Sequence, residues 1–175
     1  MSCDLLVGST GFVGGNLLAK HTFAAACHSS DITAQYGTRP DLCVYAGVPA
    51  AMFLANADPA ALRAFFAAND FNALAFTDAR SRYQFYNLGR LWSDMEAARA
   101  ADVKLLHLCT PPVSAAEVYT AVTGKTDWHN ELPKPPFDYD LRSRHAALLG
   151  GSGDYLCTKQ QELDDITRFM RSWRD

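Results

Sequence analysis

Short apolar runs alternate with polar or glycine-containing turns through the first third of the chain. Runs of strand length occupy residues 4–7, 23–27 and 41–47. Between the first two, residues 12–20 carry apolar side chains at helical spacing. A further helix is predicted over residues 60–68, behind an N-cap aspartate and a first-turn proline. Strands that alternate with helices predict an α/β fold on a parallel sheet whose third strand is buried.

The pattern changes from about residue 70. Two aromatic-rich stretches, residues 71–76 and 82–86, are predicted to be extended, with a turn over residues 78–81 between them. An amphipathic helix with Asn87 as a candidate cap follows, and residues 103–109 are predicted to be a buried strand. The apolar face of that helix consists of Leu88, Leu91, Trp92, Met95 and Ala98.

Helix boundary signals dominate the last third of the chain. Ser114 and Glu117 form a capping-box pattern, which predicts a helix through Val122 that Gly124 ends. Residues 125–139 contain three prolines and are predicted to be a loop. A helix over residues 142–149 is expected next, capped by Asp140 and ended by Gly150 and Gly151. The inward face of the final helix is predicted to be Leu163, Ile166, Met170 and Trp173.

The turn after the first strand carries glycines at GxxGxxG spacing. Gly8 allows a tight turn, Gly11 allows the backbone to approach a pyrophosphate, and Gly14 allows the new helix to pack on the strand. The positive end of that helix then faces the phosphates. A turn that binds nothing is the alternative, but the preceding strand and following helix favour a dinucleotide site. The expected contacts are Gly8, Ser9, Thr10, Gly11, Phe12, Val13 and Gly14.

With its surroundings, VGSTGFVGGNL resembles the extended branch of the short-chain dehydrogenase/reductase superfamily. These proteins are NAD(P)-dependent nucleotide-sugar epimerases, dehydratases and reductases, and the likeness is specific for residues 4 to about 60. The resemblance implies a Rossmann-like parallel sheet, a dinucleotide cofactor and a nucleotide-sugar ligand. It also implies two parts: the N-terminal half of a Rossmann domain in residues 1–70, and a small α+β substrate-lobe-like portion in residues 71–175.

Polar residues at the end of the second strand bear on the choice between NAD and NADP. An acid at this place favours NAD, whereas hydroxyl or basic groups tolerate the 2′-phosphate of NADP. Ser29 and Ser30 occupy it and Asp31 follows slightly late, so the sequence leans to NADP, although a plain polar loop explains each serine equally well. By resemblance, the backbone after the third strand also passes the cofactor. That segment comprises Ala46, Gly47 and Val48.

Two interpretations of the catalytic residues stay open. Members of the resembled family use a tyrosine, a lysine one helical turn later and a serine or threonine on a strand end. Tyr155 and Lys159 fit the Tyr-x-x-x-Lys pattern, and Thr110 follows a predicted strand. The first interpretation therefore makes the chain an active oxidoreductase or epimerase.

The second interpretation, which we favour, takes residues 71–175 as a substrate lobe without the catalytic segment. RYQFYNLGRLWSDME, LLHLCTPPVSAAEVY and YDLRSRHAALLGGSGDYL resemble that lobe more than the catalytic half. Thr158 and Gln161 also form a capping pair of their own, which would leave Tyr155 outside the helix. Tyr155 then becomes a packing residue and Lys159 a solvated one. Such a shortened dinucleotide-binding protein leaves part of its sheet uncovered, which a second copy of the chain would cover.

Composition narrows the remaining functional classes. The 175 residues are 49% hydrophobic, the formal net charge is −3 and no basic block occurs, so nucleic acid is excluded as an expected partner. No apolar run reaches the length of a membrane span and no targeting pattern is present, which predicts a cytoplasmic protein without a membrane partner.

The cysteines and histidines number five each, without metal-ligand spacing, so we expect buried free thiols and no metal. A non-enzymatic interaction module is the third functional hypothesis, although a plain hydrophobic core explains the same aromatic residues better. Its surface would be formed by Tyr83, Phe85, Tyr86, Trp92 and Trp128.

Overall fold

The chain is a mixed α/β protein with a three-stranded parallel sheet and several helices. The computed structural model describes residues 3–47 and 73–172. The described residues form two compact units. Residues 3–47 and Leu88–Trp92 make the first unit, and residues 73–87 and 93–172 make the second.

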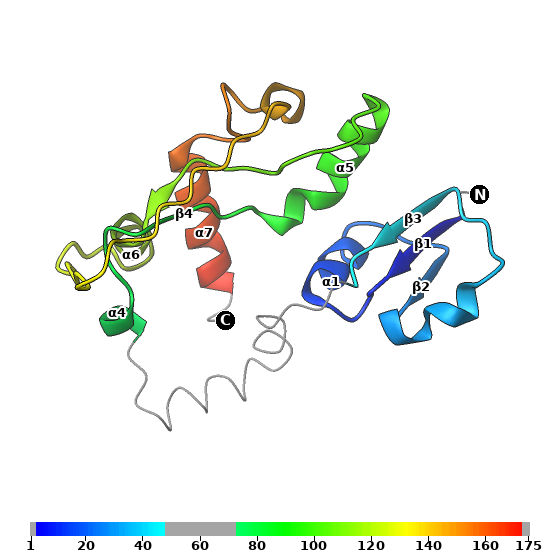
Figure 1. Cartoon of the computed structure of the whole chain (residues 1–175), viewed down its shortest axis with the longest axis horizontal. Helices are drawn as coiled ribbons and strands as arrows, with labels where there is room; N and C mark the ends of the chain where they lie inside the picture. The colour runs from blue at the N-terminus through cyan, green and yellow to red at the C-terminus, as the bar shows by residue number, and fades with distance from the viewer. Residues whose placement is uncertain (1–2, 48–72, 173–175) are drawn as a thin grey trace. The chain divides into compact units, whose positions relative to one another are not determined.

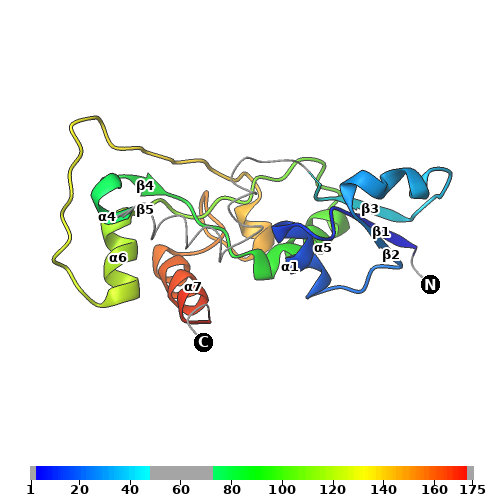
Figure 2. The same cartoon turned by 90° about the horizontal axis from the view of Figure 1, so that it is seen from below.

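The parallel sheet lies in the first unit. Its strands are β1 (Asp4–Val7), β2 (Ala25–Cys27) and β3 (Leu42–Tyr45), in the order β2-β1-β3 (Figures 1 and 2). All four residues of β1 are buried because β1 has a neighbour on each side. The predicted parallel arrangement is confirmed. The expectation that the third strand is buried is wrong, because among the described strands β3 pairs with β1 alone and its Tyr45 is 55% exposed.

Helix α1 (Phe12–Leu18) follows β1 and ends two residues earlier than predicted. A 3-10 helix that the sequence pattern did not predict, η1 (Ser29–Gln35), follows β2. The unit is completed by η2 (Leu88–Arg90) and by Trp92, whose ring stacks on His21 at 3.7 Å between centroids. His21 Nε2 lies 3.0 Å from the buried Asp4 carboxylate.

The second unit pairs a two-stranded antiparallel ladder with helices. The ladder joins β4 (Arg82–Tyr83) to β5 (Val113–Ser114), and α6 (Ala115–Thr123) packs against α7 (Lys159–Ser172) (Figure 1). The remaining elements are α4 (Ala73–Phe76), α5 (Leu91–Ala100) and the 3-10 helix η3 (Ala146–Leu149). The first two residues of α5 belong to the first unit and the rest of the helix to the second.

Both predicted capping boxes are confirmed. The Ser114 side chain accepts a hydrogen bond from Glu117 N, while Glu117 Oε2 accepts one from Ser114 N at 2.7 Å. Gly124 ends α6 with φ of 72°. At α7, Thr158 N donates to Gln161 Oε1 and Gln161 N donates to Thr158 Oγ1, so the helix begins at Lys159.

Several predicted elements are wrong. Residues 73–76 are helical rather than extended, in keeping with their alanine and leucine content. Residues 103–109 form no strand: Leu105 is 71% exposed, and Val103 is the one β-branched residue among them. The face of α5 predicted to be apolar also includes a charged residue, because Asp94 is buried together with Ala98. The Asp94 carboxylate accepts a hydrogen bond from the Tyr86 hydroxyl at 2.7 Å.

Of the helix predicted over residues 142–149, only the short 3-10 helix η3 forms, and its N-cap is His145 rather than Asp140. The Gln84 side chain explains the difference. Its Oε1 accepts from Leu141 N at 2.8 Å and its Nε2 donates to Leu141 O at 2.7 Å, so these backbone groups of Leu141 bond to Gln84 rather than within a helix. Gly150 ends η3 as expected, with φ of 81°.

All five cysteines are free, but Cys109 is the buried one and Cys3 and Cys43 are exposed, which corrects the expectation of buried thiols. None of the helices in the described residues has the length and apolar character needed to cross a bilayer. Val48, the predicted helix over residues 60–68 and Trp173 lie outside the described residues.

Candidate functional site

The carboxyl ends of the three strands meet at the glycine turn. Gly8 N and Ser9 N both donate to Cys27 O, at 2.9 and 3.1 Å, which ties the turn to the end of β2. On the other side, Ala46 N donates to Val7 O at 2.8 Å, which ties it to the end of β3. The structure therefore brings together the predicted contacts of the glycine turn with Ala46 and Gly47.

Two glycines of this turn are required by its geometry. Gly8 has a φ of +89°, and a Cβ there would lie 2.6 Å from Gly47 N. A Cβ on Gly14 would lie 2.1 Å from Gly8 O, inside any allowed contact distance. At Gly15, the next residue of α1, a Cβ would have no other atom within 4 Å. Gly14 is therefore what allows α1 to start directly against the turn.

Gly11 has a different role from its two neighbours in the motif. It is the N-cap of α1, with φ of −79° and ψ of 166°, a conformation open to any residue. The first helical bond runs from Gly15 N to Gly11 O, and no side chain caps the helix. The amides of Phe12, Val13 and Gly14 thus have no partner within the helix. They add partial positive charge at the turn, and no acidic residue in the first turn offsets it.

The end of β2 carries a small polar network. His28 Nδ1 caps η1 by accepting from Ser30 N, and it lies 2.7 Å from Ser30 Oγ. Ser30 Oγ in turn donates to Asp31 Oδ1 at 2.9 Å. Ser29 is the first residue of η1. A carboxylate therefore lies within hydrogen-bond reach of the serine on which the expectation of NADP rests.

The three candidate catalytic residues have separate partners. Tyr155 precedes α7, and its hydroxyl donates to Asp140, which raises the pKa of Tyr155. Lys159 Nζ lies 2.9 Å from Glu117 Oε1. A proton-transfer tyrosine needs its pKa lowered by a nearby lysine. These contacts do not create that arrangement.

Thr110 is buried beside a carboxylate that sequence reasoning missed. Thr110 Oγ1 and Glu162 Oε2 are buried side-chain atoms without a hydrogen-bond partner in the part of the chain that the structure describes. Glu162 Oε1 accepts from Phe85 N at 2.7 Å, and burial raises the pKa of this carboxyl to about 7. Helical spacing could have identified Glu162, since it lies four residues before Ile166 on the inward face of α7.

The aromatic residues of the third hypothesis belong to both units. Trp92 belongs to the first unit, and Trp128 Nε1 donates to Leu74 O at 3.1 Å. Tyr83 contacts Phe85 and Tyr139, at centroid distances of 6.2 and 6.0 Å. An interaction surface built from these residues stays a prediction.

The chain matches no known protein-family model, no curated protein and no solved structure. No group of three or more metal-ligating side chains occurs within residues 3–47 and 73–172. The glycine turn and its strand ends are the arrangement from which we infer a function.

Proposed function

We propose that the first unit binds the pyrophosphate of NAD or NADP at the glycine turn, in the manner of the extended short-chain dehydrogenase/reductases that its sequence resembles. The observation that carries the proposal is the fit of Gly14 against the turn, where a Cβ would lie 2.1 Å from Gly8 O. This contact fulfils the role that the third glycine of a dinucleotide motif has in packing helix on strand. Gly8 fulfils the matching requirement on the strand side, because a Cβ there would lie 2.6 Å from Gly47 N.

The strand order supports a ligand at this edge of the sheet. The chain passes from β1 through α1 to β2 on one side, and then returns to place β3 on the other side of β1. Ligands of parallel α/β sheets bind outside the carboxyl ends of the strands where the order reverses in this way. That point lies between β1 and β3, where Gly8 and Gly47 meet. We interpret the sheet as part of a Rossmann-like domain.

The chemistry of the turn also fits a phosphate. The amides at the start of α1 that have no partner within the helix supply hydrogen-bond donors, and no carboxylate in the first turn of the helix repels an anion. Phe12 and Val13 are exposed. A bound nicotinamide would supply hydride-transfer chemistry, while the residues of this turn bind and orient the phosphates.

Binding without catalysis is the function that we favour. Oxidoreductase or epimerase chemistry through Thr110, Tyr155 and Lys159 would need a tyrosine that loses its proton readily. The hydrogen bond from Tyr155 to Asp140 acts in the opposite direction, because it raises the pKa of the phenol. A nucleotide-sugar ligand, which the resemblance implies, stays a prediction.

Titration of NADH and NADPH against the full chain tests the proposal. Gly11→Trp is the decisive variant: its backbone conformation suits tryptophan, and the indole would occupy the phosphate path. Lys20→Trp, an exposed position beyond the end of α1, controls for the added indole. We expect saturable binding by the wild type and by Lys20→Trp, and none by Gly11→Trp. Absence of binding with either dinucleotide, or equal binding by both variants, would overturn the proposal.

The same titration decides between the two dinucleotides. The sequence leans to NADP through Ser29 and Ser30, whereas the Asp31 carboxylate bonded to Ser30 would repel a 2′-phosphate. Asp31→Ser is therefore expected to strengthen NADPH binding relative to NADH. An unchanged ratio would show that the β2 end does not contact the adenosine ribose.

A further inference from the structure

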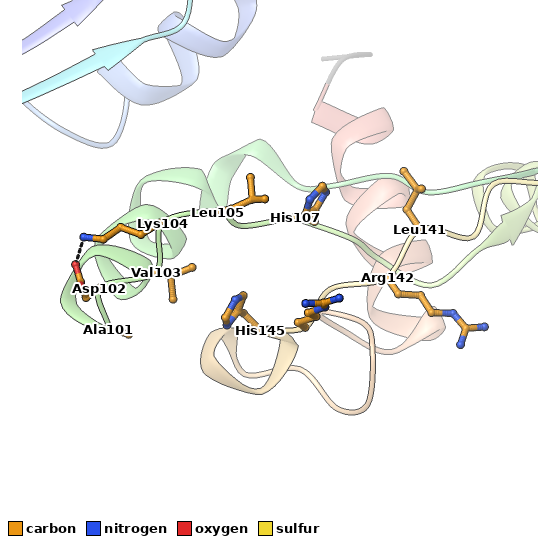
Figure 3. A pocket seen from close by; sticks show the side chains of 10 residues that line it. Ala101, Asp102, Val103, Lys104, Leu105, His107, Leu141, Arg142 and His145 are labelled. Atoms are coloured by element: carbon orange, nitrogen blue, oxygen red, sulfur yellow. Dashed lines mark hydrogen bonds and ion pairs between the residues drawn. The ribbon is translucent and has the colours of Figure 1, made fainter.

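The second unit contains a pocket of about 760 Å³ that is separate from the residues of the glycine turn. Two chain segments line it: residues 101–107, which follow α5, and residues 141–145, which lead to η3 (Figure 3). The volume lies in the range of small-molecule sites. Its lining residues are Ala101, Asp102, Val103, Lys104, Leu105, His107, Leu141, Arg142, Arg144 and His145.

Basic groups dominate the polar part of this lining. Two of them are already paired: Lys104 with Asp102, and Arg142 with Asp140 at 3.1 Å and Asp154 at 3.3 Å. Figure 3 shows the Arg142 side chain directed away from His107 and His145. These two cations are therefore largely neutralised by the protein's own carboxylates.

Arg144 differs from those two. No carboxylate pairs with its guanidinium anywhere in residues 3–47 and 73–172. The imidazoles of His107 and His145 lie on opposite segments of the same pocket (Figure 3). An arginine presents a planar fork of donors that matches a carboxylate or a phosphate. The one carboxylate of the lining, Asp102, pairs with Lys104, so the guanidinium of Arg144 and the two imidazoles face the pocket without a carboxylate partner among the described residues.

Apolar side chains supply the rest of the wall. Leu105 is 71% exposed and Leu141 is 63% exposed, and both border the pocket together with Val103. Together these three side chains give the pocket an apolar wall beside its polar groups, the usual composition of a site for a molecule with an apolar part. Inorganic phosphate alone would leave these side chains in water.

We propose that this pocket binds a small organic anion, one carboxylate or phosphate group attached to an apolar or aromatic body. Arg144 holds the anionic group, His107 and His145 donate further hydrogen bonds, and Leu105 and Leu141 cover the apolar body. The proposal does not depend on dinucleotide binding by the first unit.

Phenyl phosphate and benzoate are the probes that test it on the full chain by isothermal titration. Both should bind saturably, inorganic phosphate should bind more weakly, and phenol should not bind. Arg144→Gln is expected to weaken phenyl phosphate binding by about tenfold or more, since it removes a charge-assisted bidentate contact. Arg168→Gln is the matched control, because this exposed arginine on α7 is paired with Asp165 at 2.6 Å outside the pocket.

Leu105→Asp gives an independent arm, because this exposed position tolerates a polar side chain while the new carboxylate repels the anion. It should weaken phenyl phosphate binding as Arg144→Gln does, and Gly11→Trp should leave that binding unchanged. The proposal is overturned if phenyl phosphate and benzoate do not saturate, or if Arg144→Gln binds as tightly as Arg168→Gln. Loss of phenyl phosphate binding in Gly11→Trp would instead assign the anion to the glycine turn.

Discussion

Glu162 is the residue whose environment departs most clearly from what its type predicts. It is 2% exposed, it accepts one hydrogen bond from Phe85 N, and its carboxylate is buried beside the Thr110 hydroxyl. Burial is the main reason that its pKa rises from 4.5 to about 7, and the nearby Glu117 adds to the rise. The folded chain therefore holds a proton here that the unfolded chain releases.

That difference predicts a stability that falls as the pH rises. Between pH 4.5 and 7 the folded state binds more protons than the unfolded state, so the free energy of unfolding decreases with pH. The contribution is fully present below 4.5 and is lost above about 7. Its size is on the order of 3 kcal/mol. Urea denaturation at a series of pH values measures it.

Glu162→Gln should remove this slope, because a neutral amide keeps the hydrogen bond from Phe85 and carries no charge. At pH 8 the variant is expected to be more stable than the wild type. Glu96→Gln, at an exposed position on α5, should leave the slope in place. Parallel profiles for the wild type and Glu162→Gln would contradict this account of the buried carboxyl.

Gly14 and Gly15 are adjacent in α1 but differ in what surrounds them. Gly14→Ala forces a methyl group onto Gly8 O and should destabilise the first unit by about 2 kcal/mol or more. Gly15→Ala has open space and should stabilise α1 by about 0.5–1 kcal/mol. Amide hydrogen exchange of Leu5 and Leu6, both buried in β1, measures the two effects. Equal changes in the two variants would show that the turn is looser than described.

For single residues, the sequence predicted the features that local backbone geometry determines. It did not predict the features that depend on contacts between residues far apart in the chain. The requirement for glycine at Gly8 and Gly14 follows from motif spacing, and the geometry agrees with it. The partner of Tyr155 could not be predicted, because Asp140 is 15 residues away in an irregular segment. Glu162 was missed because a charged side chain is expected in water.

Among the helices and strands, those with boundary signals in the sequence formed where they were expected. The capping boxes at Ser114 and Thr158 and the left-handed glycine at Gly124 each act within a few residues. The strand expected over residues 103–109 had no such signal, since an apolar run becomes a strand only where a neighbouring strand pairs with it. Here no ladder forms, and Leu105 borders the pocket instead.

The cap of α6 gives a prediction at this scale. Ser114→Ala removes the acceptor for Glu117 N and should lower the free energy of unfolding by about 1 kcal/mol. Glu117 also pairs with Lys159 on α7, so amide exchange in α7 is expected to quicken as well. Thr126→Ala, in the exposed loop after α6, is the control and should have little effect. A loss below about 0.3 kcal/mol would contradict a role for this box in stability.

For the whole molecule, the described residues divide into two units near residue 71, and Leu88–Trp92 joins the first unit. The composition shift near residue 70 lies at this place in the sequence. The packing of Leu88–Trp92 into the first unit could not be predicted, because it depends on the stacking of Trp92 on His21 and not on a local sequence pattern. A second copy of the chain covering the exposed side of β3 stays a prediction.

Dinucleotide binding at the glycine turn is the central claim, and amide chemical shifts during an NADH titration test it most directly. We predict saturable shifts at Phe12, Val13 and Gly14, because their amides are the proposed phosphate donors, and smaller shifts at Gly8 and Gly47 beside them. In Gly11→Trp the same amides should stay unchanged as NADH is added. Saturable shifts that are confined to other residues, or no shifts at millimolar NADH, would contradict the claim.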